Sequence, residues 1–246
     1  EKPLPPPSAF SQAFAARGAH VFESILDVAW IDEYRNRVLT YAEKLNDGIV
    51  KSAEQEELPQ HLRSFRDRGV FNLSIATLQR DGAEKSLLLE IVFRLKAAGV
   101  LEALETFFGE KCYFMLDASS IRMHRPSTDI IKSRLNFHQE AAAFSYPKSD
   151  FCGCVIWIPL EQIFEGMPSF QFINRKFDDV LPHAGNSISG MIEIENQGDF
   201  QDVYAADIVD AHNLSTGDVV VISPLTPHRT VTPSDFSRRR VSLDLR

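Results

Sequence analysis

The spacing of the hydrophobic residues changes near residue 110, and this change restricts the folds that the chain can adopt. Before that point, the segments 24–48 and 84–111 place apolar residues three and four positions apart, which is typical of amphipathic helices. We expect the first helix to end at Gly48, and we expect breaks in the second segment at Gly99 and Gly109. Between them, the segment 59–80 is mixed and predicts a turn with a short strand or helix.

After residue 110 the pattern is one of short β-rich runs separated by turn residues, which favours a barrel or a double-sheet sandwich. The runs are 111–126, 152–162, 189–197, 217–225 and 238–246. We therefore predict a single domain over residues 1–246 of the α+β, mainly β class. In this prediction a mainly helical part, residues 1–110, packs on a β core formed by residues 111–246.

Composition restricts the class of partner. The formal net charge of −8 argues against nucleic acid, because binding to phosphates needs a basic surface. No run of 18 apolar residues occurs, so we expect no membrane span. Cys112, Cys152 and Cys154 are expected to be free thiols, which fits a reducing cytoplasm, and the start of the sequence lacks a secretion signal pattern. The expected partner is a small molecule, and the sequence leaves the oligomeric state open.

A histidine and a carboxylate stand two residues apart in "LNFHQEAAAF", at His138 and Glu140. If this run is a strand, both side chains point to the same face and offer two metal ligands. Two histidines and one carboxylate form the facial triad that selects non-haem iron(II). The candidates for the second histidine are His183, His212 and His228, and we favour His228 because it directly follows a strongly apolar strand that gives it rigid support.

Arginines cluster at the start of the last predicted strand, in "SRRRVSLDLR". A buried guanidinium is costly unless it is paired, and its planar fork suits a carboxylate. Strand alternation places Arg240, Ser242 and Arg238 on one face and Arg239 on the other. Alternation therefore leaves Arg240 and Arg238 as candidates to bind a carboxylate, and it disfavours Arg239 if Arg240 points inward.

Taken in order, "NFHQE", "CGCVIWIPLEQIFEGMPSFQFI", "GDVVV" with "PHRT", and "RVSLDLR" resemble the iron(II)- and 2-oxoglutarate-dependent oxygenases. Within them, the sequence resembles the phytanoyl-CoA dioxygenase-like family, over about residues 112–246. The resemblance implies a double-stranded β-helix, which is a cupin-like jelly-roll barrel. It also implies iron(II) on His138, Glu140 and His228, and the distal carboxylate of 2-oxoglutarate on Arg240 and Ser242 with a contact from Thr230.

The activity implied by the resemblance is a dioxygenase that uses iron(II), 2-oxoglutarate and O₂. Such an enzyme hydroxylates an unactivated C–H bond of a small metabolite and releases succinate and CO₂. The carboxylate at position 140 leaves no coordination position for chloride, so halogenation is disfavoured. The alternative is a cupin-type metal-binding protein or isomerase, which would not need the Arg240 fork. The sequence does not identify the substrate, although Arg122, Arg125, Arg134 and Arg175 would suit an anion.

Overall fold

The computed structural model describes residues 7–54, 70–74, 85–115, 119–124, 135–143, 153–185 and 192–246. Its α-helices are α1 (Pro7–Arg17), α2 (Val28–Glu54), α5 (Lys85–Ala97), α6 (Val100–Phe108), α8 (Glu140–Ala143) and α9 (Gln197–Tyr204). Two short 3₁₀ helices, η2 (Ala205–Asp207) and η3 (Ala211–Asn213), follow α9. Arg125, Arg134 and Cys152, named above, lie outside the described residues.

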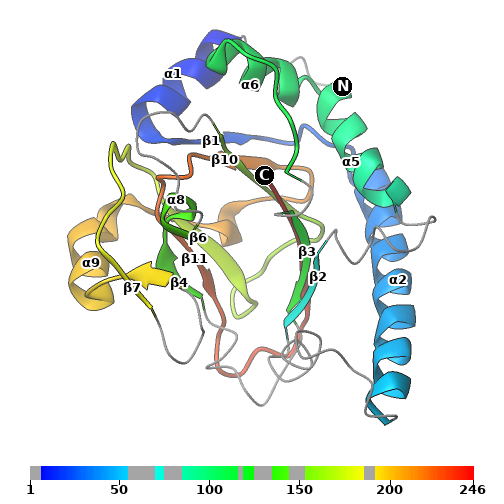
Figure 1. Cartoon of the computed structure of the whole chain (residues 1–246). Helices are drawn as coiled ribbons and strands as arrows, with labels where there is room; N and C mark the ends of the chain where they lie inside the picture. The colour runs from blue at the N-terminus through cyan, green and yellow to red at the C-terminus, as the bar shows by residue number, and fades with distance from the viewer. Residues whose placement is uncertain are drawn as a thin grey trace.

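The strands form three antiparallel sheets (Figure 1). The six-stranded sheet has the order β1 (Ala19–Phe22), β10 (Val219–Ile222), β5 (Val155–Pro159), β12 (Arg240–Leu245), β3 (Ser120–His124) and β2 (Val70–Ser74). The four-stranded sheet has the order β4 (Leu135–His138), β11 (His228–Val231), β6 (Ser169–Ile173) and β9 (Ile208–Asp210). A two-stranded ribbon pairs β7 (His183–Gly185) with β8 (Ile192–Ile194).

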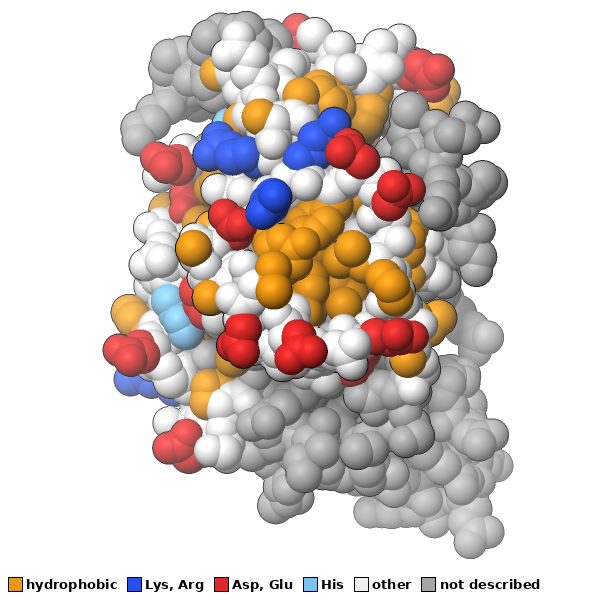
Figure 2. All heavy atoms as spheres, turned by 90° about the vertical axis from the view of Figure 1, so that its left-hand side faces the viewer, with side chains coloured by type: hydrophobic (Ala, Val, Ile, Leu, Met, Phe, Trp, Pro, Cys, Tyr) orange, Lys and Arg blue, Asp and Glu red, His pale blue; other side chains and the backbone are white. Residues whose placement is uncertain are grey.

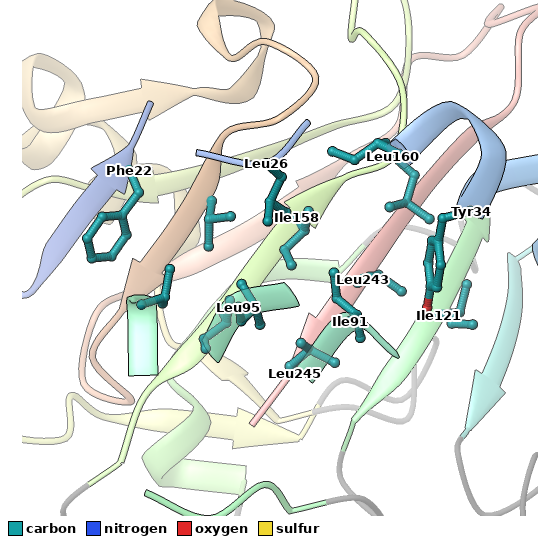
Figure 3. Close-up of a cluster of buried hydrophobic side chains, with 14 of the residues drawn as sticks. Phe22, Leu26, Tyr34, Ile91, Leu95, Ile121, Ile158, Leu160, Leu243 and Leu245 are labelled. Atoms are coloured by element: carbon teal, nitrogen blue, oxygen red, sulfur yellow. The ribbon is translucent and has the colours of Figure 1, made fainter. Parts of the chain in front are cut away.

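The two larger sheets pack face to face, and helices cover the outer face of the six-stranded sheet. The largest apolar cluster joins α1, α2, α5 and α6 to this outer face, where side chains such as Tyr34, Ile91, Ile158 and Leu243 interlock (Figure 3). A second cluster lies between the sheets, where the Trp157 and Phe170 rings stack at 4.9 Å. Because side chains alternate along a strand, the outer face is hydrophobic and the inner face is available for polar groups.

Strand β12 shows this alternation clearly. Val241, Leu243 and Leu245 belong to the cluster under the helices. Arg240 and Asp244 line the space between the two sheets, and alternation places Ser242 on their side. Arg240 therefore lies on the inner face of β12, and alternation along the observed strand keeps Ser242 on that face.

Several predictions about the helical part can be compared with the structure. Gly99 and Gly109 both have left-handed backbone angles and separate or end helices, as predicted. The predicted stop at Gly48 is wrong, because α2 continues through it to Glu54. A glycine inside a helix costs only about 1 kcal/mol relative to alanine, which good helix formers on both sides can offset.

The β structure also begins earlier than predicted. Strands β1 and β2 come from the part expected to be mainly helical, and they form the two edges of the six-stranded sheet. Within the segment 59–80, the described part is strand β2. The N-terminal part thus contributes two edge strands to the sheet, and its helices cover the outer face of the same sheet.

Figure 2 shows the face of the molecule that lies on the left of Figure 1. Hydrophobic side chains gather in its middle, with acidic side chains below them and Lys and Arg above. Among the described residues, no helix combines the length and the apolar character needed to cross a bilayer.

Candidate metal centre

Two histidines face each other across neighbouring strands of the four-stranded sheet. His138 ends β4, and its partner in the antiparallel register is His228, the first residue of β11. Their ring centroids are 4.2 Å apart, and both side chains are buried. His228 is therefore the histidine that the structure brings to His138, as the sequence predicted.

Glu140 reaches the same place by a route that the sequence analysis did not predict. The strand ends at His138, and Glu140 is the first residue of the short helix α8, so the expected strand geometry for the pair is wrong. The three alanines that follow Glu140 are strong helix formers, and a carboxylate is favourable in the first turn of a helix. The prediction had relied on the apolar character of this run, which a helix satisfies as well.

Gln139 fixes the turn between strand and helix. Its side chain is fully buried, and its amide nitrogen donates to the carbonyl oxygens of Leu225 and Asp179. Its side-chain oxygen accepts a hydrogen bond from the Leu181 N–H, and its own N–H donates to Nε2 of His183. These bonds tie the turn to two distant loops, so the candidate ligands on either side are held in position.

The three candidate ligands converge. Ligand atoms of His138, Glu140 and His228 all lie within 4.8 Å of one another. Oε1 of Glu140 is 3.5 Å from Nε2 of His228 and 4.0 Å from Nε2 of His138. Two atoms that each bind one ion at about 2.1 Å lie no more than about 4.2 Å apart, and both separations satisfy this limit.

The imidazole rings are oriented for metal binding. Nδ1 of His138 lies 2.9 Å from the Asn136 carbonyl oxygen, and Nδ1 of His228 lies 3.0 Å from that of Thr226. A carbonyl oxygen only accepts, so each Nδ1 carries the proton and each Nε2 offers its lone pair toward Glu140. Burial, more than any other cause, lowers the pKa of His138 to about 3, which keeps the ring neutral as a metal ligand must be.

Arg246 holds the Glu140 carboxylate. Its Nε donates to Oε2 at 3.1 Å, and its Nη2 donates to Oε1. Burial by itself raises the pKa of Glu140, but the contact with His228 and the charge of Arg246 outweigh it and hold that pKa well below its ordinary value. Glu140 is therefore an ionised carboxylate in a buried site.

Arg240 lies between the sheets with much of its hydrogen-bonding capacity unused. It is 1% exposed, and Nη2 donates to Nδ1 of His124 at 2.8 Å. Its Nε and Nη1 have no hydrogen-bond partner among the described residues. Burial lowers the pKa of Arg240 to about 10, so the guanidinium is charged at neutral pH.

His124 is the buried neighbour of Arg240 in the six-stranded sheet. It is opposite Arg240 in the register of β3 and β12, and it is 2% exposed. Burial, and then the charges of Arg240 and Arg122, hold the pKa of His124 well below its ordinary value. The neutral ring accepts the Arg240 hydrogen bond and so orients the guanidinium.

The other predicted cosubstrate residues fall into two groups. Ser242 and Thr230 are buried, Thr230 lines the space that holds Arg240, and the Ser242 hydroxyl has no partner among the described residues. Arg238 and Arg239 are exposed and precede β12. Arg240 is thus the arginine of this cluster that lies inside the molecule.

The other candidate histidines have different neighbours. His183 is half-buried in β7 beside Gln139, and Nδ1 of His212 pairs with Asp210 at 2.9 Å. Arg246, Gln139 and His124 were not named as site residues from the sequence. Arg246 could have been predicted from the sequence, because the alternation that places Arg240 on the inner face also places Arg246 there.

Solved structures with the same arrangement of elements exist at low sequence identity. EctD from S. alaskensis, solved with 2-oxoglutarate and 5-hydroxyectoine, is 13% identical with a TM-score of 0.60, covering 100% of this chain and 77% of that one. The epimerase SnoN, in complex with Fe3+, alpha ketoglutarate and nogalamycin RO, is 12% identical with a TM-score of 0.60, covering 97% and 82%. The non-heme alpha ketoglutarate dependent carbocyclase SnoK is 13% identical with a TM-score of 0.56, covering 96% and 81%. This chain shares their fold.

Sequence comparison is less informative. No protein-family model matches the chain, and no curated protein sequence matches it. The narrower resemblance to the phytanoyl-CoA dioxygenase-like family therefore stays a prediction from the motifs. The structural similarity extends over nearly the whole chain, including the N-terminal helices.

Proposed function

We propose that this chain is an iron(II)- and 2-oxoglutarate-dependent dioxygenase, built on a double-stranded β-helix, that hydroxylates an unactivated C–H bond of a small molecule. The observation that carries the proposal is the pairing of the triad of His138, Glu140 and His228 with the buried Arg240 fork. The fold shared with SnoN, SnoK and EctD supports it.

The donor set fits the proposed ion and cosubstrate. Two neutral imidazoles and one carboxylate form the triad that non-haem iron(II) prefers. The two unpaired nitrogens of Arg240 and the unpaired Ser242 hydroxyl are buried hydrogen-bond donors, which are costly unless a ligand accepts from them. A carboxylate placed between them satisfies both groups and pairs the buried charge.

In the proposed enzyme, the histidines hold the iron and the Arg240 side of the site holds the cosubstrate. Iron(II) with 2-oxoglutarate and O₂ supplies the oxidising chemistry, in which succinate and CO₂ are released and one oxygen atom enters the substrate C–H bond. His138 and His228 present Nε2 because their Nδ1 protons are held by backbone carbonyls. Arg240 and Ser242, with Thr230 beside them, orient the cosubstrate, and burial between the sheets excludes water.

Arg246 is the side chain that we expect to move when cosubstrate binds. The space among the inner residues, including His138, Arg240 and Arg246, is only about 10 Å³, so at least one of them must shift. If Nη2 of Arg246 leaves Oε1 of Glu140 while Nε keeps its 3.1 Å bond to Oε2, the oxygen that faces both imidazoles becomes available. Side-chain rearrangements of this size are common on binding.

The reaction outcome and the alternative class are both open to test. SnoN is described as an epimerase and SnoK as a carbocyclase, so the fold accommodates outcomes other than hydroxylation. A cupin-type metal-binding protein or isomerase would use the triad but would not need a buried guanidinium with two unpaired nitrogens. That guanidinium favours the 2-oxoglutarate enzyme.

The decisive experiment is anaerobic titration of the metal-free protein with iron(II) and then with 2-oxoglutarate. We expect one equivalent of iron to bind, and 2-oxoglutarate to produce the visible charge-transfer absorption of its iron(II) chelate. His138→Ala should abolish this absorption, while His212→Ala, which changes a histidine away from the triad, should keep it. Succinate release with O₂, across a panel of small molecules, then tests turnover.

Two results would contradict the proposal. Iron binding without any absorption change on addition of 2-oxoglutarate would favour the cupin-type alternative. Equal absorption in His138→Ala and the unaltered protein would place the iron elsewhere.

A further inference from the structure

Two cavities adjoin the candidate metal centre. The inner cavity lies between the sheets and is lined by His138, His228 and Arg240. The outer cavity is lined by Glu140 and by residues of α6, β5 and the segment 111–115. Val155 and Arg246 line both cavities, so the triad stands at the boundary between them.

The outer cavity has the size and the lining of a small-molecule site. Its volume is about 300 Å³, at the lower end of the range for ligand pockets. Its wall includes Leu101, Leu104 and Phe108 from α6, Phe114 from the following segment, and Ile156 from β5. The backbone of Met115 is fixed to the end of β12 by a 2.6 Å hydrogen bond to the Arg246 carbonyl, which holds that wall in place.

The charged groups of this lining are already paired. Lys111 is bonded to Glu105 at 2.9 Å, and Arg246 is bonded to Glu140. Glu110 adds an exposed negative charge. In the described part of this lining each cation has a carboxylate partner, so an anionic group inside the cavity would have to compete with Glu105 or Glu140 for it.

The arginines that the sequence suggested for an anionic substrate do not change this conclusion. Arg122 lines the inner cavity and pairs with Asp244. Arg175 is exposed, and its nearest acid is Asp207 at 3.8 Å. Neither lines the outer cavity, and Arg125 and Arg134 lie outside the described residues.

A neighbouring cavity of about 230 Å³ is a weaker candidate. It shares Phe108, Gly153 and Pro224 with the outer cavity, but none of the three triad residues is in its lining among the described residues. A reacting C–H bond must lie close to the metal, and of these two cavities the outer one is lined by a triad residue, Glu140.

We infer that the outer cavity is the substrate chamber and that it takes a compact, uncharged, hydrocarbon-rich molecule. This inference rests on the proposed function. Cosubstrate then approaches the metal from the Arg240 side and substrate from the α6 side. We expect free amino acids and other strongly charged metabolites to bind poorly, because Lys111 and Arg246, the cations in the described lining, are already paired with carboxylates.

The location of the substrate chamber is tested with N-phenyl-1-naphthylamine, an uncharged probe that fluoresces when it enters an apolar site. Leu101→Trp places an indole in the chamber, and we expect it to weaken probe binding at least ten-fold. Thr106→Trp makes the same change on the exposed face of the same helix, and it should leave probe binding unchanged. Equal affinity of both variants would overturn the location.

A second measurement uses the unaltered protein, so it does not depend on correct folding of the Leu101→Trp variant. Cys112 lines the chamber and is half-buried. In the unaltered protein, saturating probe should slow alkylation of Cys112 by N-ethylmaleimide at least five-fold, read on the Cys112 peptide by mass spectrometry. Unchanged alkylation of Cys112 in the presence of bound probe would also overturn the location.

The substrate class is tested by competition between two molecules of matched length. Dimethyl octanedioate is uncharged, while octanedioate carries a carboxylate at each end and cannot keep both outside the chamber. The ester should displace the probe at a concentration at least ten-fold below that of the diacid. Displacement at equal concentrations would overturn the assigned class.

These outcomes are independent of the proposed function. Probe binding, alkylation and competition need no turnover, and they are measured on the chain before and after iron loading. A protein that binds the probe as expected but gives no iron–2-oxoglutarate absorption would refute the proposed function alone. A protein that gives the absorption but fails the Leu101 and Cys112 tests would refute the chamber alone.

Discussion

Arg240 combines full burial, a positive charge and two nitrogens without a partner among the described residues. A side chain in this state is costly for the folded protein unless a ligand completes its hydrogen bonds. The position of Arg240, opposite His124 and on the inner face of β12, therefore supports the proposal that a ligand binds to it. The same reasoning does not apply to Arg238 or Arg239, which are exposed.

Replacing Arg240 should raise the KM for 2-oxoglutarate more than any other change in the arginine cluster. A charge-assisted bidentate contact is worth about 1.5–3 kcal/mol, which corresponds to roughly a ten- to hundred-fold increase in KM for Arg240→Ala. Arg240→Lys should recover only part, because an ammonium lacks the planar fork. Steady-state kinetics with iron and substrate saturating measure this effect.

Arg239→Ala and Arg238→Ala are the matched controls for this prediction, because both side chains are exposed. Each should change the KM for 2-oxoglutarate by less than two-fold. A larger effect at Arg238 or Arg239 than at Arg240 would mean that cosubstrate binds outside the space between the sheets.

Much of this site can be predicted residue by residue from the sequence. The H-x-E spacing, the supported His228 and the alternation around Arg240 each depend on local pattern. The structure brings His138, Glu140 and His228 together and buries Arg240, although Glu140 lies on a helix and not on the predicted strand. The bonds between Arg246 and Glu140 span 106 positions, and no local pattern reports such a pairing. The helix at Glu140 was missed because a run of alanines satisfies a strand and a helix equally well at the level of hydrophobicity.

At the scale of elements, the turn from β4 to α8 depends on Gln139. Its buried side chain makes three hydrogen bonds to backbone groups of two loops that are far away in the sequence. These loops precede His228 and His183, so the turn is hydrogen-bonded to the loop that leads into His228, the second candidate ligand.

Gln139→Leu should lower the free energy of unfolding by about 1–3 kcal/mol, because it leaves buried backbone groups without partners. It should also weaken iron binding, since His138 and Glu140 flank the altered residue. Urea unfolding and equilibrium dialysis measure the two effects. Gln162→Leu, which removes a half-buried bond to the Leu214 carbonyl, is the control and should leave iron binding unchanged. Iron affinity that is intact in Gln139→Leu would contradict the positional role.

Helices α2 and α5 are joined by an ion pair whose contribution should depend on pH. Arg37 donates to both oxygens of Glu90 at 2.8 Å, and the indole N–H of Trp30 donates to the same carboxylate. The hydrogen bonds from Arg37, more than any other cause, lower the pKa of Glu90 below its ordinary value. A carboxyl with a lowered pKa stabilises the folded protein above its unfolded pKa, and this stabilisation is lost as pH falls through the folded value.

Glu90→Gln should therefore be less stable than the unaltered protein by about 0.5–1 kcal/mol at pH 7, a magnitude typical of partly exposed pairs. The difference should shrink below the ordinary pKa of 4.5 and vanish once Glu90 is protonated in both states. Urea unfolding at pH 7, 5 and 3 measures it, with Glu102→Gln on the exposed face of α6 as the control. A constant difference over this range would be inconsistent with the ion pair.

For the whole molecule, the two faces of the six-stranded sheet have different tasks: one packs against the helices, and the other carries polar groups of the candidate site. Its outer face carries the large apolar cluster under α1, α2, α5 and α6, and its inner face carries the polar groups of the site. The sequence predicted helices packed on a β core, but it could not predict that β1 and β2 form the edges of the sheet. Pairing between strands that are distant in sequence is decided by packing of the whole chain, which local pattern does not report.

Ile91 offers a test of this separation, because it is fully buried in the outer cluster and lies on α5 (Figure 3). Ile91→Ala should lower the free energy of unfolding by about 2–5 kcal/mol, and Ile91→Val by about 0.5–1.5 kcal/mol, since the cost follows the size of the cavity created. Both variants should bind iron and 2-oxoglutarate within two-fold of the unaltered protein at a temperature where they remain folded. Guanidinium unfolding and the iron–2-oxoglutarate absorption titration provide the two measurements. If cosubstrate affinity instead falls in proportion to the lost stability, the two faces of the sheet are coupled, and the inner face is held in its binding geometry by the helices that cover the outer one.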